Sequence, residues 1–90
     1  MLEPVYPKSF RKQYKLMKKR GMKLDKLIDV MDIIINEQPL PPERCNHPLK
    51  GEWKDTLEFH IQGDWVLVYE IDPAARTVTF HRTGSHSDLF

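Results

Sequence analysis

The fold is decided by residues 57–82, which read LEFHIQGDWVLVYEIDPAARTVTFHR. Apolar and polar residues alternate in the first five positions, a period of two that predicts a strand with one buried face. Residues 65–71 are apolar on both faces apart from Glu70, so we expect them to form the central strand. Residues 77–82 predict a third strand. Turn residues separate the three segments, so they should form an antiparallel meander.

The N-terminal half predicts two helices. Ser9 is a suitable N-cap for a helix over residues 9–20, and Gly21 is a natural end to it. The apolar stripe of this helix consists of Phe10, Tyr14 and Met17. A second helix is expected over residues 24–37, before a proline-rich segment at residues 39–42. Its apolar face comprises Leu24, Leu27, Ile28, Met31, Ile34 and Ile35.

The order of the elements predicts an α+β fold of one domain over residues 1–90. The short connection at Gly21 should join the helices as an antiparallel hairpin that covers one face of a small antiparallel sheet. A short strand at Val5-Tyr6 and an ordered loop over residues 39–54 complete the expected architecture.

Composition points to a cytoplasmic protein that does not enter a membrane. Cys45 is the single cysteine, so no intramolecular disulfide forms and a reducing compartment is expected. The first ten residues lack the apolar run of a signal peptide. The apolar stretch at residues 33–35 is far too short to span a bilayer.

The charge is distributed unevenly along the chain. Residues 1–26 contain nine Lys or Arg against two acids, a net charge of +7, while the remainder carries five against eleven, a net charge of −6. A basic block of this kind can contact phosphate backbones, but from charge alone a solvated helix face is the favoured interpretation.

Histidines in the second half supply the candidate chemistry. His60 lies opposite the apolar face of its strand and should project to the uncovered side of the sheet, with Asp64 in the following turn. Arg82 and His86 lie at the end of the last strand and in the tail, so these groups can converge. Histidine transfers protons near neutral pH and arginine grips phosphate with two donors, which is what RNA cleavage by a ribose 2′-OH needs. By spacing alone this set is weak evidence, because a single histidine on a strand is more often a surface or hydrogen-bonded residue than a catalyst.

A metal site is a poorer interpretation. Cys45 and His47 are two residues apart, but no second Cys/His pair follows at zinc-binding spacing. We therefore expect no metal and no cofactor. His81 is interpreted as a surface residue of the last strand.

Three motifs resemble the YafQ-type toxins of the RelE superfamily. They are His47-Pro48-Leu49-Lys50-Gly51-Glu52-Trp53-Lys54, then His60 followed by Asp64-Trp65 and Tyr69, then the ending Arg82-Thr83-Gly84-Ser85-His86-Ser87-Asp88-Leu89-Phe90. Before His47 the resemblance is only compositional, although length and element order agree over the whole chain. Any one motif alone would be unspecific; their shared order and spacing carry the resemblance.

The resemblance implies a RelE-like microbial ribonuclease fold and a toxin that cleaves messenger RNA in the ribosomal A site, without a metal. By the same resemblance, His86 is expected to be the general acid, His60 or Asp64 the base and Arg82 the phosphate clamp, while His47 positions or activates the RNA. The expected RNA contacts are Trp65, Phe90, Lys50, Lys54, Lys15, Lys18 and Lys19.

The implied partners are messenger RNA, the 70S ribosome and a cognate antitoxin similar to DinJ or RelB. Promoter DNA would be bound only through the antitoxin complex. Two alternatives stay open at this point: a non-catalytic module of the same fold that binds RNA or antitoxin, and a ribonuclease active on free RNA. The sequence does not indicate the codon preference, the cut position, the antitoxin or the stoichiometry.

Overall fold

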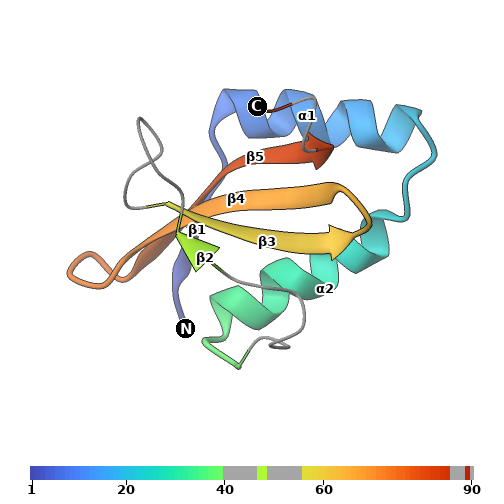
Figure 1. The fold of residues 1–90 in the computed structure, drawn as a ribbon. Coiled ribbons are helices and arrows are strands. Elements are labelled where there is room, and N and C mark those ends of the chain that lie inside the picture. The colour runs from blue at the N-terminus through green and yellow to red at the C-terminus, as the bar shows by residue number, and fades with distance from the viewer. Residues whose placement is uncertain (40–46, 49–55, 86–88, 90) are drawn as a thin grey trace.

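The computed structural model describes residues 1–39, 47–48, 56–85 and 89, and it centres on a five-stranded sheet (Figure 1). The strand order is β1-β5-β4-β3-β2. The strands are β1 (Glu3–Val5), β2 (His47–Pro48), β3 (Leu57–Gln62), β4 (Trp65–Asp72) and β5 (Thr77–Ser85). The predicted meander is confirmed, because β3, β4 and β5 pair antiparallel in sequence order.

The sheet is mixed, so the prediction of a wholly antiparallel sheet is wrong. β1 pairs with β5 in parallel, with Glu3 opposite Thr77, and the Glu3 amide donates to the Arg76 carbonyl at 2.9 Å. Parallel pairing needs a long connection between the two strands, and here both helices and three further strands lie between them in sequence. The N-terminal strand thereby covers an edge of β5 that would otherwise expose unpaired backbone.

Two irregularities shape the meander. The register shifts between His60 and Gln62 on β3, close to the predicted turn at Gly63, whose φ of 58° suits glycine. A second shift lies where Val68 pairs with Arg82 and Tyr69 pairs with Phe80, so one residue of β5 is inserted between these pairs. Bulges of this kind redirect side chains next to a site.

The two helices, α1 (Lys8–Lys19) and α2 (Leu24–Ile35), pack on one face of the sheet, α1 against β5 and α2 against β3 (Figure 1). Gly21 ends the first helix region as predicted, with a φ of 75°. The predicted cap at Ser9 is wrong, because Pro7 is the N-cap and makes no side-chain bond. The Ser9 hydroxyl instead donates to the His81 carbonyl at 3.3 Å and ties α1 to β5.

The main core lies between the helices and the sheet. The predicted stripe of α1 supplies buried Phe10 and Met17, and α2 supplies buried Leu27, Met31 and Ile34. From the sheet come Phe59, Ile61, Trp65, Leu67, Tyr69, Val78 and Phe80. Burial of this apolar surface is the main force that holds the layers together.

One buried hydrogen bond joins two strands within this core. Trp65 is 2% exposed, and its indole Nε1 donates to Thr83 Oγ1 at 2.9 Å. Thr83 is 0% exposed, and its hydroxyl donates in turn to the Val66 carbonyl at 3.1 Å. The hydroxyl therefore satisfies a buried donor that no water can reach.

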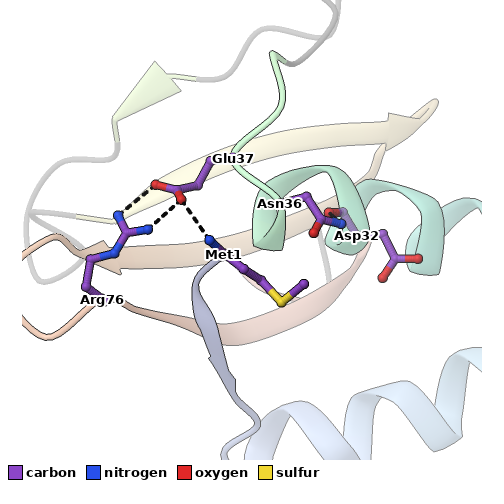
Figure 2. Close-up of polar contacts among 5 residues, drawn as sticks. All are labelled: Met1, Asp32, Asn36, Glu37 and Arg76. Atoms are coloured by element: carbon purple, nitrogen blue, oxygen red, sulfur yellow. Dashed lines mark hydrogen bonds and ion pairs between the residues drawn. The ribbon is translucent and has the colours of Figure 1, made fainter.

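An ion-pair cluster fastens the far end of the sheet (Figure 2). Glu37 accepts from Arg76 at 2.8 and 2.6 Å and from the Met1 ammonium at 3.3 Å, so it links the end of α2, the β4–β5 turn and the start of the chain. The hydrogen bonds from Arg76 come first among the causes that lower the pKa of Glu37 from 4.5 to about 2.

No helix in the described part of the chain is long and apolar enough to cross a membrane.

Acid should remove the contribution of Glu37 to stability. Because its pKa is lowered in the folded state, this contribution is complete above about pH 4.5 and is lost as the pH falls toward 2. The free energy of unfolding of Glu37→Gln should therefore lie below that of the wild type at pH 7, and the gap should narrow as the pH falls below about 4.5 and be nearly gone by about pH 2 in urea titrations. The control Glu3→Gln changes an exposed acid and should show little gap at any pH. A pH-independent gap for Glu37→Gln would contradict this assignment.

Removing the Thr83 hydroxyl should leave the indole donor of Trp65 buried without an acceptor. Thr83→Val is expected to lower the free energy of unfolding by about 1–3 kcal/mol. In a Trp65→Phe background the same change should cost clearly less, because the donor is gone. The control Thr79→Val alters a half-buried threonine of the same strand and should have a small effect. Equal costs of Thr83→Val in both backgrounds would show that the bond does not contribute.

Candidate active site on the helix-free face

The face of the sheet opposite α1 and α2, which we call the helix-free face, gathers several of the predicted catalytic residues. Its members follow from strand alternation, since neighbours of Phe59 and Leu67 along each strand must point away from the helices. They form two rows across three strands. The rows are Glu58–Val68–Arg82 and His60–Val66–Gly84.

The rows bring His60 and Arg82 close together. Each lies one strand from β4, on opposite sides of it, so two strand spacings separate them laterally. Neighbouring strands lie about 4.8 Å apart, so the lateral separation is about 10 Å. His60 pairs with Val66 and Arg82 with Val68, an offset of two residues or about 7 Å along β4, so their backbones are about 12 Å apart. An imidazole and a long guanidinium side chain can approach one phosphate from positions this far apart. The predicted convergence of His60 and Arg82 on one face is thus consistent with the register.

This face is not bare, contrary to the sequence-based expectation of an uncovered side. Val66 and Val68 are 0% exposed and form a second small apolar cluster with Leu89, which is 9% exposed. Leu89 itself therefore packs on this face. The polar residues therefore surround a small apolar centre and do not stand on an open sheet.

Glu58 and His60 form the closest polar contact on the helix-free face. His60 Nε2 lies 2.9 Å from Glu58 Oε1. The Glu58 side chain is 1% exposed, whereas that of His60 is 36% exposed. A buried carboxylate thus holds an imidazole whose other edge reaches the surface.

Sequence analysis missed Glu58. The signal was present, because Glu58 precedes His60 by two residues and shares its side of the strand, between Leu57 and Phe59. An acid in that position is costly to bury unless it is partnered, and His60 provides the partner.

Arg82 and Asp64 occupy two different settings. Arg82 is half-buried in the row that contains Glu58, next to the bulge in β5. Asp64 is exposed in the tight turn between β3 and β4, at the end of the face nearest His60. Asp64 is therefore closer in the fold to the imidazole than to the guanidinium.

Four of the predicted RNA contacts, Trp65 and three lysines of α1, lie away from the helix-free face. Trp65 points into the main core and is 2% exposed, so the prediction that it stacks on a base does not fit its burial. Its role in the fold is to hold β4 to β5 through Thr83. The lysines Lys15, Lys18 and Lys19 are exposed on α1, the helix that packs on the opposite face, so they lie away from His60.

Several predicted site residues lie outside the described residues. They are Lys50, Lys54, His86 and Phe90. Of His47 only the backbone is described, in β2, where it pairs with Glu58. The register thus places His47 beside the row that contains Glu58 and Arg82.

His81 is more than the surface residue that was predicted. Its Nε2 lies 3.0 Å from Glu70 Oε1, and its side chain is 29% exposed. It occupies the inserted position of the bulge in β5. The chain therefore has two histidine–glutamate pairs, of which only the pair with Glu58 is buried on its acidic side.

A metal centre does not emerge from the donors that are described. Among residues 1–39, 47–48, 56–85 and 89, no three His, Cys, Asp or Glu side chains cluster closely enough to hold an ion.

Comparisons with known proteins match this chain along its whole length. The family model described as the bacterial toxin of type II toxin–antitoxin system, YafQ, matches residues 2–90. The mRNA interferase toxin YafQ of Escherichia coli K12 is 37% identical over 86 residues, covering 94% of this chain and 91% of that protein. A metal-bound toxin from Helicobacter pylori is 42% identical, with a TM-score of 0.92 and full coverage of both chains. A chain of the E. coli DinJ–YafQ complex is 35% identical, with a TM-score of 0.90, covering 100% of this chain and 99% of that one.

Proposed function

The chain belongs to the YafQ family of type II toxin–antitoxin toxins, and from that premise we propose that it is an endoribonuclease that cleaves messenger RNA in the ribosomal A site. The cut would arrest translation. The relatives named as mRNA interferases support the reaction class, and the helix-free face supplies groups suited to it.

One observation supports the proposal most strongly, namely that the Glu58–His60 pair lies on the same face of the sheet as Arg82. A base and a cation must flank the same phosphate for a 2′-OH to attack it, and the strand register brings these two residues to one face. The second histidine–glutamate pair, His81–Glu70, lies at the bulge in β5, and the row of Glu58 and Arg82 separates it from the row of His60.

Glu58 selects the form of His60 that can act as a base. A carboxylate oxygen 2.9 Å from Nε2 favours the tautomer that carries its proton there and donates it to Glu58. The Nδ1 lone pair is then available to accept the proton of the ribose hydroxyl. The buried carboxylate also stabilises the imidazolium that results, as an acid behind a catalytic histidine does in hydrolases. Asp64 is the alternative base.

The remaining groups complete the transfer. The 2′ oxygen forms a bond to phosphorus, the bond to the 5′ oxygen breaks, and that oxygen takes a proton from a general acid. We assign the acid to His86, whose described neighbours Ser85 and Leu89 are both anchored on this sheet. Arg82 grips the charged phosphorane with paired donors, and His47 positions the RNA. The products are a 2′,3′-cyclic phosphate and a 5′-hydroxyl end.

RNA binding extends beyond the reacting phosphate. Phe90 is proposed to stack on a base, with Lys50 and Lys54 on nearby phosphates. The exposed lysines of α1, including Lys15, Lys18 and Lys19, form a separate basic surface for ribosomal RNA. Since ribosomes are the site of action, we place the protein in the cytoplasm.

A cognate antitoxin similar to DinJ is the proposed protein partner, by analogy with the DinJ–YafQ complex. The basic N-terminal region suits a flexible acidic segment of such a partner. Promoter DNA would be contacted through the antitoxin.

His60→Ala and Arg82→Ala should each lower the rate of mRNA cleavage on translating ribosomes by about 10²–10⁴-fold, with the fold retained. The matched control is His81→Ala, which also breaks a histidine–glutamate pair but is given no part in the proposed mechanism, and it should cleave within a few-fold of the wild type. Full activity of His60→Ala and Arg82→Ala would remove these residues from the mechanism. A wild-type chain that binds RNA or antitoxin without cutting would instead favour a binding module.

Cleavage should persist in the presence of a chelator, because the proposed steps use only protein side chains. Primer extension with and without EDTA tests this on ribosomes whose integrity is checked separately. The metal-bound relative from H. pylori makes the experiment necessary. Activity that is lost with EDTA and restored by one added divalent ion would overturn the metal-free mechanism. Equal cutting of naked transcript would show that ribosomes are not required.

A further inference from the structure

The segment of β5 that carries Arg82 borders an edge of the sheet that β1 does not cover. β1 pairs with β5 only as far as Thr79, and in the described part of the chain no strand continues this edge beyond it. Helix α1 packs against β5 and lies alongside it (Figure 1). The bulge at His81 falls in the same stretch, so the regular ladder with β4 is interrupted there as well. Backbone groups around Arg82 therefore need partners from outside the sheet.

Two side chains of α1 supply such partners, one on each side of Arg82. The Ser9 hydroxyl donates to the His81 carbonyl at 3.3 Å, and Gln13 Oε1 accepts from the Thr83 amide at 3.0 Å. Ser9 and Gln13 are four residues apart, so they share one face of the helix. A neighbouring strand would also present donors to carbonyls and acceptors to amides along this edge, and the two side chains take its place.

The bond to Gln13 is the stronger of the two. The Ser9 side chain is exposed, and its bond of 3.3 Å is long for a hydroxyl donor, so water can replace it at little cost. Gln13 is half-buried, and its amide oxygen meets the amide of a fully buried residue at an ordinary distance. Loss of this acceptor would leave a buried backbone N–H without a partner.

Thr83 passes this restraint on to the central strand. Its amide is held by Gln13, while its hydroxyl accepts from Trp65 Nε1 and donates to the Val66 carbonyl. Thr83 is therefore bonded to α1 and to β4 at once. Because Arg82 is the preceding residue, movement of its backbone away from β4 would strain these bonds.

We propose that Gln13 is a positioning residue for the cleavage reaction: its amide oxygen fixes the bulged segment of β5 so that the Arg82 guanidinium meets the scissile phosphate on the helix-free face. The inference rests on the proposed function for the role of Arg82. Gln13 acts through the backbone and makes no contact with the RNA. A bidentate grip on phosphate depends on geometry, so a small displacement of Arg82 weakens it.

Two variants separate the acceptor of Gln13 from its bulk. Gln13→Met keeps the length of the side chain and removes the acceptor, whereas Gln13→Glu keeps an oxygen that accepts from the Thr83 amide. The ligand is a trinucleotide with methylated 2′ oxygens, which binds without being cut, and NMR titration of the full chain gives its dissociation constant. Gln13→Met should bind it roughly tenfold more weakly than the wild type, and Gln13→Glu within about threefold.

A double-mutant cycle shows whether the effect passes through Arg82. In an Arg82→Ala background, Gln13→Met should change the affinity less than about twofold, because the group that it positions is gone. The matched control is Gln62→Met, which also removes a glutamine Oε1 with one hydrogen bond, from Lys26 at 3.0 Å, and it should leave the affinity unchanged.

Hydrogen exchange tests the restraint in the absence of RNA. In Gln13→Met the Thr83 amide should exchange at least about tenfold faster than in the wild type, while the Leu67 amide on β4 keeps its rate. Equal acceleration of both amides would indicate a general loss of stability and would contradict a local role. Circular dichroism checks the fold of each variant. Gln13→Ala removes the same acceptor and replaces Gln13→Met in every measurement if the latter does not fold.

Four further results would overturn the inference. They are wild-type affinity in Gln13→Met, an equal loss of affinity in Gln13→Glu, an equal loss in the Arg82→Ala background, and a wild-type chain that does not bind the trinucleotide. None of these measurements uses ribosomes or cleavage. A wild-type chain that binds the trinucleotide through Arg82 but fails to cut messenger RNA therefore contradicts the proposed function alone. A chain that cuts messenger RNA while Gln13→Met binds normally contradicts this inference alone.

Discussion

The antiparallel register of β3, β4 and β5 is the constraint on which the rest of the structure depends. Since side chains alternate between faces, one register sends Phe59 and Leu67 toward the helices and Glu58 and His60 away from them. A slip of one residue on β3 would bury the imidazole in the main core and expose the phenyl ring. The cost of that exchange ties the geometry of the candidate site to the stability of the core, so the fold and the site are specified together.

Sequence periodicity was sufficient to predict the meander, the two helices and the side of the sheet on which His60 lies. It was insufficient where a contact depends on residues distant in sequence. β1 pairs with β5 in parallel because β5 would otherwise have a free edge. The sequence around Glu3 contains no local pattern that predicts this pairing. The placing of Trp65 illustrates the same limit, since an aromatic residue after a turn suits stacking on RNA, and only the three-dimensional structure shows it bonded to Thr83 in the core.

The proposed active site and the surface of the helices lie on opposite faces of the molecule. Glu58, His60 and Arg82 are held by strands on the helix-free face, where the sheet keeps the three side chains in fixed relation. The helices form the opposite face, with a charged and partly apolar surface between them.

The central claim is that one phosphate is held between His60 and Arg82 on the helix-free face. The most direct measurement is side-chain NMR of the chain titrated with a trinucleotide whose 2′ oxygens are methylated, so that binding occurs without cleavage. The account predicts that the imidazole signals of His60 and the guanidinium signals of Arg82 shift together along one saturable curve, while those of His81 stay in place. Shifts confined to His81, or to the lysines of α1, would contradict it.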